Sequence, residues 1–149
     1  MSYINGSDLL VKVGEKSIGH CTSHTVSYSA ETKDRAVKPA ASVTSTTAGL
    51  WKDKAVTSLS VSVQAEGLRV YGETEMGMAD LLAAYKSGTP VTITAFARSK
   101  SSVPYMTGSF VISSLEESSP AGDDATFSVT FDNTGEVTLT PSAVDVSAE

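Results

Sequence analysis

The sequence predicts a mainly β fold, an antiparallel β-sandwich or barrel with one flanking α-helix. Apolar side chains alternate with Ser and Thr in several segments, and only one segment, about residues 74–87, has helical periodicity. No repeat or low-complexity linker divides the 149 residues. The whole chain, residues 1–149, is therefore expected to form a single domain.

The alternation is clearest in residues 58–65. Ser or Gln separates four apolar residues there, Leu59, Val61, Val63 and Ala65. Because successive side chains of a strand point to opposite faces, this pattern predicts a strand with one buried face. Strands are expected over residues 8–13, 18–29, 54–66, 91–96, 109–113 and 126–131, with a turn at Gly14-Glu15 between the first two.

One segment has the periodicity of a helix. Apolar side chains fall at i, i+3, i+4 and i+7, at Met78, Leu81, Leu82 and Tyr85. Thr74 is a suitable N-cap. Gly88 and Pro90 end the helix, because glycine tolerates the left-handed conformation and proline cannot continue a helix. We expect this helix, about residues 74–87, to cover one face or one open end of the β structure.

Two segments lack a clear period. Residues 30–54 are expected to form a long loop, and loops longer than about 12–15 residues are usually functional or disordered. This loop carries five of the 11 basic residues of the chain: Lys33, Arg35, Lys38, Lys52 and Lys54. Residues 133–149 are expected to form a C-terminal tail, so both termini are extended in this prediction.

The charge of the chain is unevenly distributed. Residues 1–100 contain 11 basic and 9 acidic residues, whereas residues 101–149 contain no basic and 8 acidic residues, which gives a net charge of −6. An acidic surface repels DNA phosphates, so specific nucleic-acid binding is not expected. The simpler interpretation is a set of solvated polar faces with an acidic tail.

The sequence shows no targeting feature. It has no apolar run of about 18 residues, so no membrane association is expected. Its first residues lack the basic and apolar stretches of a secretory signal. The single cysteine, Cys21, excludes an intrachain disulfide. These observations predict synthesis in a reducing cytoplasm.

The only cluster that suggests a metal site contains His20, Cys21 and His24. On a strand the two histidines would lie roughly 13 Å apart, with Cys21 on the opposite face. Zinc ligands lie within about 2.0–2.3 Å of one ion, so these residues are not expected to bind a metal.

Catalytic patterns are also missing. Glu116 and Glu117 are adjacent and would point to opposite faces of a strand, which makes them a poor acid–base pair. Asp123 and Asp124 have the character of turn residues, with calcium binding as a weak alternative. No nucleophile elbow and no phosphate-binding loop is present. We therefore expect neither enzymatic activity nor a cofactor.

Trp51 is the only tryptophan and ends the long loop. One interpretation makes it an anchor in the hydrophobic core. The other makes it an interface anchor, because tryptophan is enriched where partner chains dock. The sequence leaves both open.

The order of these parts resembles a known family. Two strands precede the polar element Thr32-Lys33-Asp34 and the long loop, which ends at Trp51 before the alternating strand of residues 56–65. This order is similar to that of the phage major tail tube proteins of long-tailed phages, over about residues 5–132. The C-terminal tail departs from the pattern.

The resemblance implies a structural virion protein, made in the bacterial host cytoplasm from a phage or prophage gene. Its copies would form six-membered rings. The stacked rings would form a hollow tail tube through which the genome passes. The implied partners are further copies and other tail proteins, with DNA only as passing cargo. Contractile and non-contractile tails both remain open.

The resemblance also implies roles for particular residues. The family's long loop reaches the neighbouring ring, so residues 31–54 would be an inter-subunit loop. Its expected contact residues are Lys33, Asp34, Arg35, Lys38, Trp51 and Lys52. An acidic lumen would let DNA slide without binding. The candidates for this lining are Glu116, Glu117, Asp123 and Asp124.

The alternative from the sequence is a ligand-binding β-sandwich module, of the carbohydrate-binding or adhesin-like kind. Such a module would need exposed aromatic side chains on one face and, usually, an export signal. A hydrolase ranks third, because the chain shows no catalytic motif.

Overall fold

The computed structural model describes residues 3–18, 20–35, 38, 53–70, 75–100 and 103–141. The chain forms two compact units, a body (residues 1–27 and 61–149) and a hairpin unit (residues 28–60). The elements in chain order are η1 (Gly6–Asp8), β1 (Leu9–Val13), β2 (Lys16–Ser17), β3 (Cys21–Arg35), β4 (Asp53–Leu68), α1 (Met78–Ser87), β5 (Val91–Ala97), η2 (Arg98–Lys100), β6 (Met106–Ser118), β7 (Thr126–Asn133) and β8 (Thr138–Leu139). The described residues thus confirm a mainly β fold with one α-helix.

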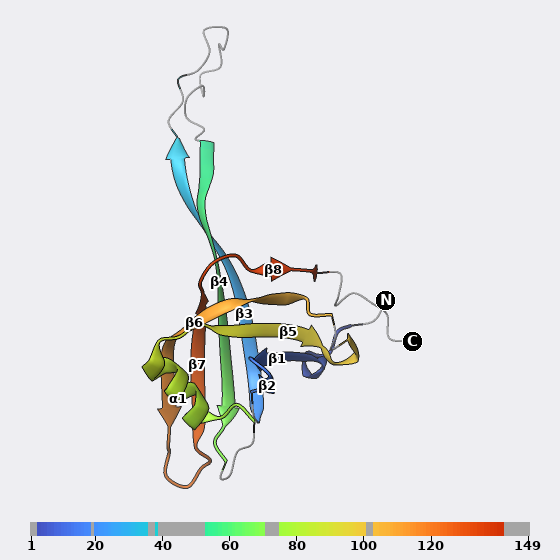
Figure 1. The fold of residues 1–149 in the computed structure, drawn as a ribbon, viewed down its shortest axis with the longest axis vertical. Helices are drawn as coiled ribbons and strands as arrows, with labels where there is room; N and C mark the ends of the chain where they lie inside the picture. Colours follow the sequence, from blue (N-terminus) through green and yellow to red (C-terminus); the bar gives the residue numbers. More distant parts are fainter. Residues whose placement is uncertain are drawn as a thin grey trace. The chain divides into compact units, whose positions relative to one another are not determined.

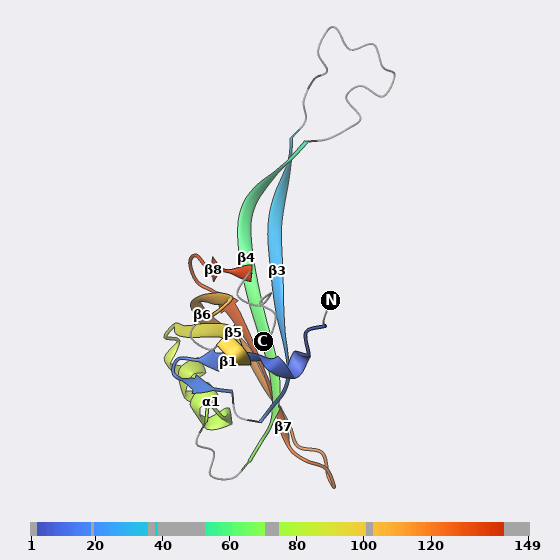
Figure 2. The same ribbon diagram turned by 90° about the vertical axis from the view of Figure 1, so that its right-hand side faces the viewer.

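The strands form one antiparallel sheet that is folded on itself. Its order is β2-β1-β5-β6-β7-β4-β3, with β8 also paired to β6. β6 belongs to both halves: Met106–Phe110 pairs with β5, Phe110–Ser118 pairs with β7, and a bulge lies between Ile112 and Ser114. Figures 1 and 2 show that β1 and β5 run across the direction of β7, in a separate layer. The body is therefore a sandwich whose two layers are joined through β6.

The core lies between these layers and follows the alternation of the sequence. Val61, Val63 and Ala65 are buried, and the next strand contributes Phe127, Val129 and Phe131 to the same cluster. From the other layer the cluster receives Val11, Val13, Ile93 and Ala95. Leu59, which shares their sequence pattern, lies in the hairpin unit and is 76% exposed, so its predicted burial was wrong.

The helix is shorter than the sequence predicted. It begins at Met78, and Gly77 occupies the N-cap position without a side-chain hydrogen bond, so the prediction of Thr74 as N-cap was wrong. Its end is confirmed: Gly88 has φ 68° and donates its backbone N–H to the Ala84 carbonyl at 3.1 Å. This left-handed conformation is one that glycine adopts without strain.

The irregular segments are also shorter than expected. β3 continues through Arg35 and β4 begins at Asp53, so both ends of the predicted loop are strand. Within the predicted C-terminal tail, β8 pairs with the start of β6. At the N-terminus, the strand expected from residue 18 begins at Cys21, and the turn at Gly14-Glu15 connects β1 to the short β2.

Candidate assembly interface

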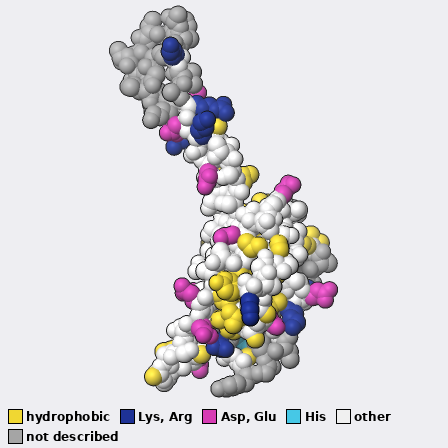
Figure 3. Space-filling view, turned by 60° about the vertical axis from the view of Figure 1, so that its left-hand side comes forward, with side chains coloured by type: hydrophobic (Ala, Val, Ile, Leu, Met, Phe, Trp, Pro, Cys, Tyr) yellow, Lys and Arg dark blue, Asp and Glu magenta, His cyan; other side chains and the backbone are white. Residues whose placement is uncertain are grey.

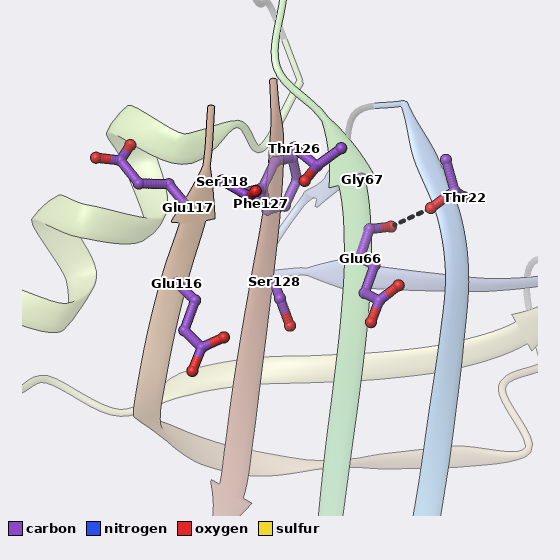
Figure 4. Close-up of a pocket in the computed structure, with 9 residues that line it drawn as sticks. All are labelled: Thr22, Glu66, Gly67, Glu116, Glu117, Ser118, Thr126, Phe127 and Ser128. Carbon is purple, nitrogen blue, oxygen red and sulfur yellow. Dashed lines mark hydrogen bonds between the residues drawn. The ribbon is translucent and has the colours of Figure 1, made fainter. Parts of the chain in front are cut away.

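A row of polar side chains crosses three strands of the body. Glu116 on β6 is the register partner of Ser128 on β7, which is the partner of Glu66 on β4. On β3, the next strand, the Thr22 hydroxyl donates a hydrogen bond to the Glu66 backbone carbonyl at 3.3 Å. Figure 4 shows these residues on neighbouring strands. Directly opposed residues share a face, so the two carboxylates belong to one surface.

The next two rows in the direction of Ser62 on β4 have the same character. Ser114, Thr130 and Gln64 form one row, and Asp132 and Ser62 lie in the next. We call this surface the polar face; it consists of Ser62, Gln64, Glu66, Ser114, Glu116, Ser128, Thr130 and Asp132. These residues include three acids and no Lys or Arg. Since the opposite face of the same strands carries the core, the polar face is the outer surface of this layer.

The predicted lumen residues do not all lie on this surface. Glu116 does, but Glu117 is the partner of Phe127, whose side chain belongs to the core face. The Glu117 carboxylate accepts a 2.7 Å hydrogen bond from Arg69 and lies toward α1 in Figure 4. The two glutamates therefore point to opposite faces, as their adjacency predicted.

Asp123 and Asp124 lie in the connection between β6 and β7. Both are exposed, and the Asp124 N–H bonds to Asp123 Oδ1 at 2.9 Å. Gly122 supplies a φ of 79° to the same turn. The expected turn is confirmed, and these carboxylates are separate from the row of Glu116.

Glu66 was not among the residues predicted to line the lumen. Its pattern contained the necessary information, because Ser58, Ser60, Ser62, Gln64 and Glu66 occupy the polar positions of one alternating segment. The apolar positions of that segment predict a buried face, and its polar positions mark the opposite, solvent-facing side.

Two strand edges of this layer are open among the described residues. β3 ends the strand order and pairs only with β4. Residues 111–118 of β6 pair with β7 on one side, because the pairing with β5 stops at Phe110. Open edges present unpaired backbone groups, which makes them sites for strand addition.

A groove separates α1 from the open part of β6. Its volume is about 790 Å³, and its lining includes Leu82, Tyr85, Ser113 and Leu115. Leu82 and Tyr85 are 50% and 53% exposed, although the sequence placed them in one buried stripe with Leu81, which is fully buried. Figure 3 shows hydrophobic side chains gathered on the body surface, with charged side chains around them.

The hairpin unit contains the last residues of β3 and the first residues of β4. The Thr57 hydroxyl donates to the Glu31 carbonyl at 3.1 Å, and Lys54 Nζ lies 3.7 Å from Asp34 Oδ1. Its hydrophobic side chains have little cover: Tyr28, Val56 and Leu59 are 57%, 61% and 76% exposed. These three side chains are therefore available for contacts with another chain.

The structure places four of the six predicted contact residues. Lys33, Asp34 and Arg35 are exposed at the end of β3, and Lys38 is also exposed. Trp51 and Lys52 lie outside the described residues. The unit as a whole, residues 28–60, contains five basic and three acidic residues, a net charge of +2, whereas the body has six basic and fourteen acidic residues, a net charge of −8.

The His20–His24 segment has no metal-site geometry. No group of three or more His, Cys, Asp or Glu side chains converges among the described residues. Partial burial raises the pKa of the Cys21 thiol and lowers the pKa of His24. The Cys21 thiol donates to the Ser23 carbonyl at 3.3 Å. In the described part of the chain, no helix has the length and apolarity needed to cross a membrane.

Comparisons with known proteins identify the family of this chain and structures with a similar fold. A family model described as phage tail tube protein matches residues 3–139. A structure of the native gene transfer agent virion has a TM-score of 0.72 at 18% identity, covering 93% of this chain and 99% of that one. The tail of the empty gene transfer agent particle, refined with C6 symmetry, has a TM-score of 0.70 at 19% identity with the same coverage. The SPP1 tail tube has a TM-score of 0.61 at 13% identity, covering 99% and 88%. No curated protein matches significantly.

Proposed function

The chain belongs to the phage tail tube protein family, and from that premise we propose that its copies join edge to edge into rings that stack as a hollow tube. Its role is structural and non-catalytic, as a component of the virion tail. The observation that carries the proposal is the pair of open edges on one layer of the body, β3 on one side and residues 111–118 of β6 on the other.

These edges suit a closed ring. Successive strands from β6 through β7 and β4 to β3 alternate in direction, so β3 and β6 run in opposite directions. A neighbour related by rotation about a tube axis keeps its strand directions. Its β3 therefore meets β6 antiparallel, and the layer continues from copy to copy. Such head-to-tail contacts close into a ring when the rotation closes.

The polar face lines the lumen in this proposal. Its acids, Glu66, Glu116 and Asp132, repel the phosphates of passing DNA, and its hydroxyl and amide groups offer no fixed positive charge. Glu117 points to the opposite face of the layer, the face that carries the core, and pairs there with Arg69. DNA is cargo and not a specific ligand.

Stacking of the rings uses the hairpin unit. Its net charge of +2 and the −8 of the body attract each other when the hairpin unit of one copy meets the body of a copy in the next ring. Lys33, Arg35 and Lys38 are the exposed basic residues that support this contact. The gene transfer agent tail has C6 symmetry, and we extend that ring number of six to this chain.

Electron microscopy of the purified protein tests the proposal. We expect stacked rings with sixfold symmetry, which dissociate at high salt if charge drives the stacking. The double variant Lys33→Glu/Arg35→Glu should give single rings in place of tubes, while Lys16→Glu in the body should leave tubes intact. A protein that stays monomeric at high concentration and binds glycans would instead favour the ligand-binding module.

A further inference from the structure

We propose that helix α1 of one copy docks into a cleft between β1 and β3 of the neighbouring copy in the ring. The cleft has a volume of about 640 Å³ and is lined on one side by η1, β1 and β2 and on the other by residues 21–24 of β3. The exposed side chains Leu82 and Tyr85 are the part of α1 that enters it. The inference rests on the proposed function, because it uses the joining of copies edge to edge, and it adds a second contact to that interface.

The helix and the cleft belong to opposite margins of one layer. In the strand order β6-β7-β4-β3, β6 lies at one margin and β3 at the other. Leu82 and Tyr85 of α1 line the groove beside β6, whereas the start of β3 lines the cleft, and the two linings share no residue. α1 therefore leaves the cleft of its own copy open. Head-to-tail contacts bring opposite margins of two copies together, so a neighbour can supply the helix.

Both surfaces lie on the core side of the layer. Glu117 points to the core side of β6 and lies toward α1 in Figure 4. The cleft is on the same side, because its other wall includes Leu9 and Val11 of β1, which belongs to the layer across the core. A neighbour that continues the layer keeps its core side on the side of α1. The helix of one copy therefore faces the cleft of the next.

The two surfaces also lie at a similar level of the layer. Glu116, which lines the groove, is the register partner of Ser128, and Ser128 is the partner of Glu66. Thr22, which lines the cleft, bonds to the Glu66 carbonyl, so the start of β3 stands at this level. Copies in a ring are related by rotation without translation along the axis. The tilt of strands in a closed barrel shifts the level by a few residues, which leaves the helix beside the cleft.

The apolar side chains of the two surfaces are incompletely covered in the single copy. Leu82 and Tyr85 are 50% and 53% exposed, whereas Leu81 of the same helix is fully buried. In the cleft, Leu9 and Leu10 are only half-buried. Removing apolar surface from water stabilises association in proportion to the area removed. Docking of α1 would therefore cover the exposed side chains of both copies in one contact.

The cleft brings no unpaired charge to this contact. Among the described residues that line it, Arg98 is the only Asp, Glu, Lys or Arg. Its guanidinium lies 3.8 Å from Asp8 Oδ1 and donates to the Ser7 carbonyl at 2.8 Å. On the helix, Asp80 lies 3.6 Å from Lys16 Nζ of its own copy. Desolvation of these groups is therefore less costly than that of isolated charges.

Disulfide trapping in the full-length protein tests the docking. Cys21 lines the cleft itself, so the variants also carry Cys21→Ser. Leu82→Cys is combined with Thr22→Cys, and Tyr85→Cys with Leu9→Cys, so that one thiol lies on the helix and one in the cleft. A disulfide requires Cα atoms about 4.4–6.8 Å apart. When diamide oxidises assembled tubes, each bond joins two thiols as they lose two protons and two electrons to the reagent. We expect at least one pair to give a ladder of cross-linked multimers on a denaturing gel.

The controls separate the inference from its premise. Val103 is 47% exposed and outside both linings, so Val103→Cys in place of the helix cysteine should give no ladder. Tubes that form normally but cross-link with neither pair would overturn the docking and leave the tube proposal standing. Failure of the wild-type protein to form rings would overturn the proposed function itself.

A second measurement covers cysteine pairs that prevent assembly. Leu82→Asp and Tyr85→Asp change exposed side chains, so the single copy should keep its fold and its Tm. Each should raise the protein concentration needed for ring formation at least about tenfold, because the carboxylate would lose its water in the cleft. Val103→Asp adds the same charge outside both surfaces and should change this concentration by less than about twofold. Equal concentrations for the three variants would contradict the docking.

Discussion

Arg69 Nη1 lies 2.7 Å from Glu117 Oε2, so an ion pair connects the residue after β4 to β6 across the intervening strand β7. The pair is charge-assisted and short, but its side chains are 42% and 52% exposed. Water and salt therefore screen it.

We predict that Glu117→Gln lowers the free energy of unfolding by no more than about 1 kcal/mol, the usual contribution of an exposed pair. Urea denaturation of the unassembled protein measures this value, with Glu116→Gln as the matched control, since no ion pair to Glu116 is found among the described residues. A loss above about 2 kcal/mol would mean that the pair is shielded from solvent far more than its exposure indicates.

Gly67 is packed against the ring of Phe127. A Cβ at this position would lie 2.8 Å from Phe127 Cζ and 3.1 Å from the His20 carbonyl oxygen. We predict that Gly67→Ala destabilises the fold by about 1–3 kcal/mol, because the ring or the edge strand must move. The Tm of the unassembled protein should fall accordingly.

Gly6→Ala is the control for this substitution, because a Cβ there meets no atom within 4 Å. If steric overlap is the cause, the smaller side chain of Phe127→Leu should reduce the additional cost of Gly67→Ala in the double variant. Equal effects of Gly67→Ala in both backgrounds would contradict the overlap.

His24 gives the fold a dependence on pH. Partial burial lowers its pKa below the ordinary value of 6.5, because the imidazolium loses hydration. The folded state thus binds the proton less readily than the unfolded state. The contribution of His24 to stability is complete above the unfolded pKa and is lost as the pH falls through the folded pKa.

We therefore predict that the free energy of unfolding declines as the pH falls from about 7.5 to about 5, and that His24→Gln makes this decline shallower. Urea denaturation at a series of pH values measures both slopes. Carboxylates titrate in both proteins and cancel in the comparison. Parallel slopes for the two proteins would show that His24 does not contribute.

The strands of the body were predictable from the sequence because the apolar residues that alternate with polar ones are the residues that the fold buries. Val63, Ala65, Val129 and Phe131 are fully buried, and each falls in the apolar register of its sequence segment. The limit of this signal is visible at Leu59, which has the same register but lies beyond the pairing of β4 with β7. Periodicity identifies a face, and only the tertiary partner determines whether that face is covered.

The hairpin unit was harder to predict for the same reason. Residues 31–35 of β3 are polar and exposed on both faces, so no alternation marks them as a strand. Their strand conformation depends on pairing with β4, for example between Glu31 and Thr57. For the helix, the apolar stripe of the sequence predicted more burial than the structure shows. Of that stripe, only Leu81 is fully buried in one copy.

The acidic side chains of the polar face should keep DNA from binding inside the tube. Glu66 and Glu116 flank Ser128 on the polar face, and reversing both charges in every copy would line the tube with a basic ring at that level. We expect tubes of Glu66→Lys/Glu116→Lys to retain short duplex DNA in a sedimentation assay at least about tenfold more than wild-type tubes, with retention falling steeply as salt rises. Glu15→Lys/Glu136→Lys changes the net charge equally at exposed positions outside the polar face, and its tubes should resemble wild type. If the two double variants retain DNA equally, total charge and not the polar face controls retention. If Glu66→Lys/Glu116→Lys forms no tubes while its control does, these carboxylates lie at a contact between subunits.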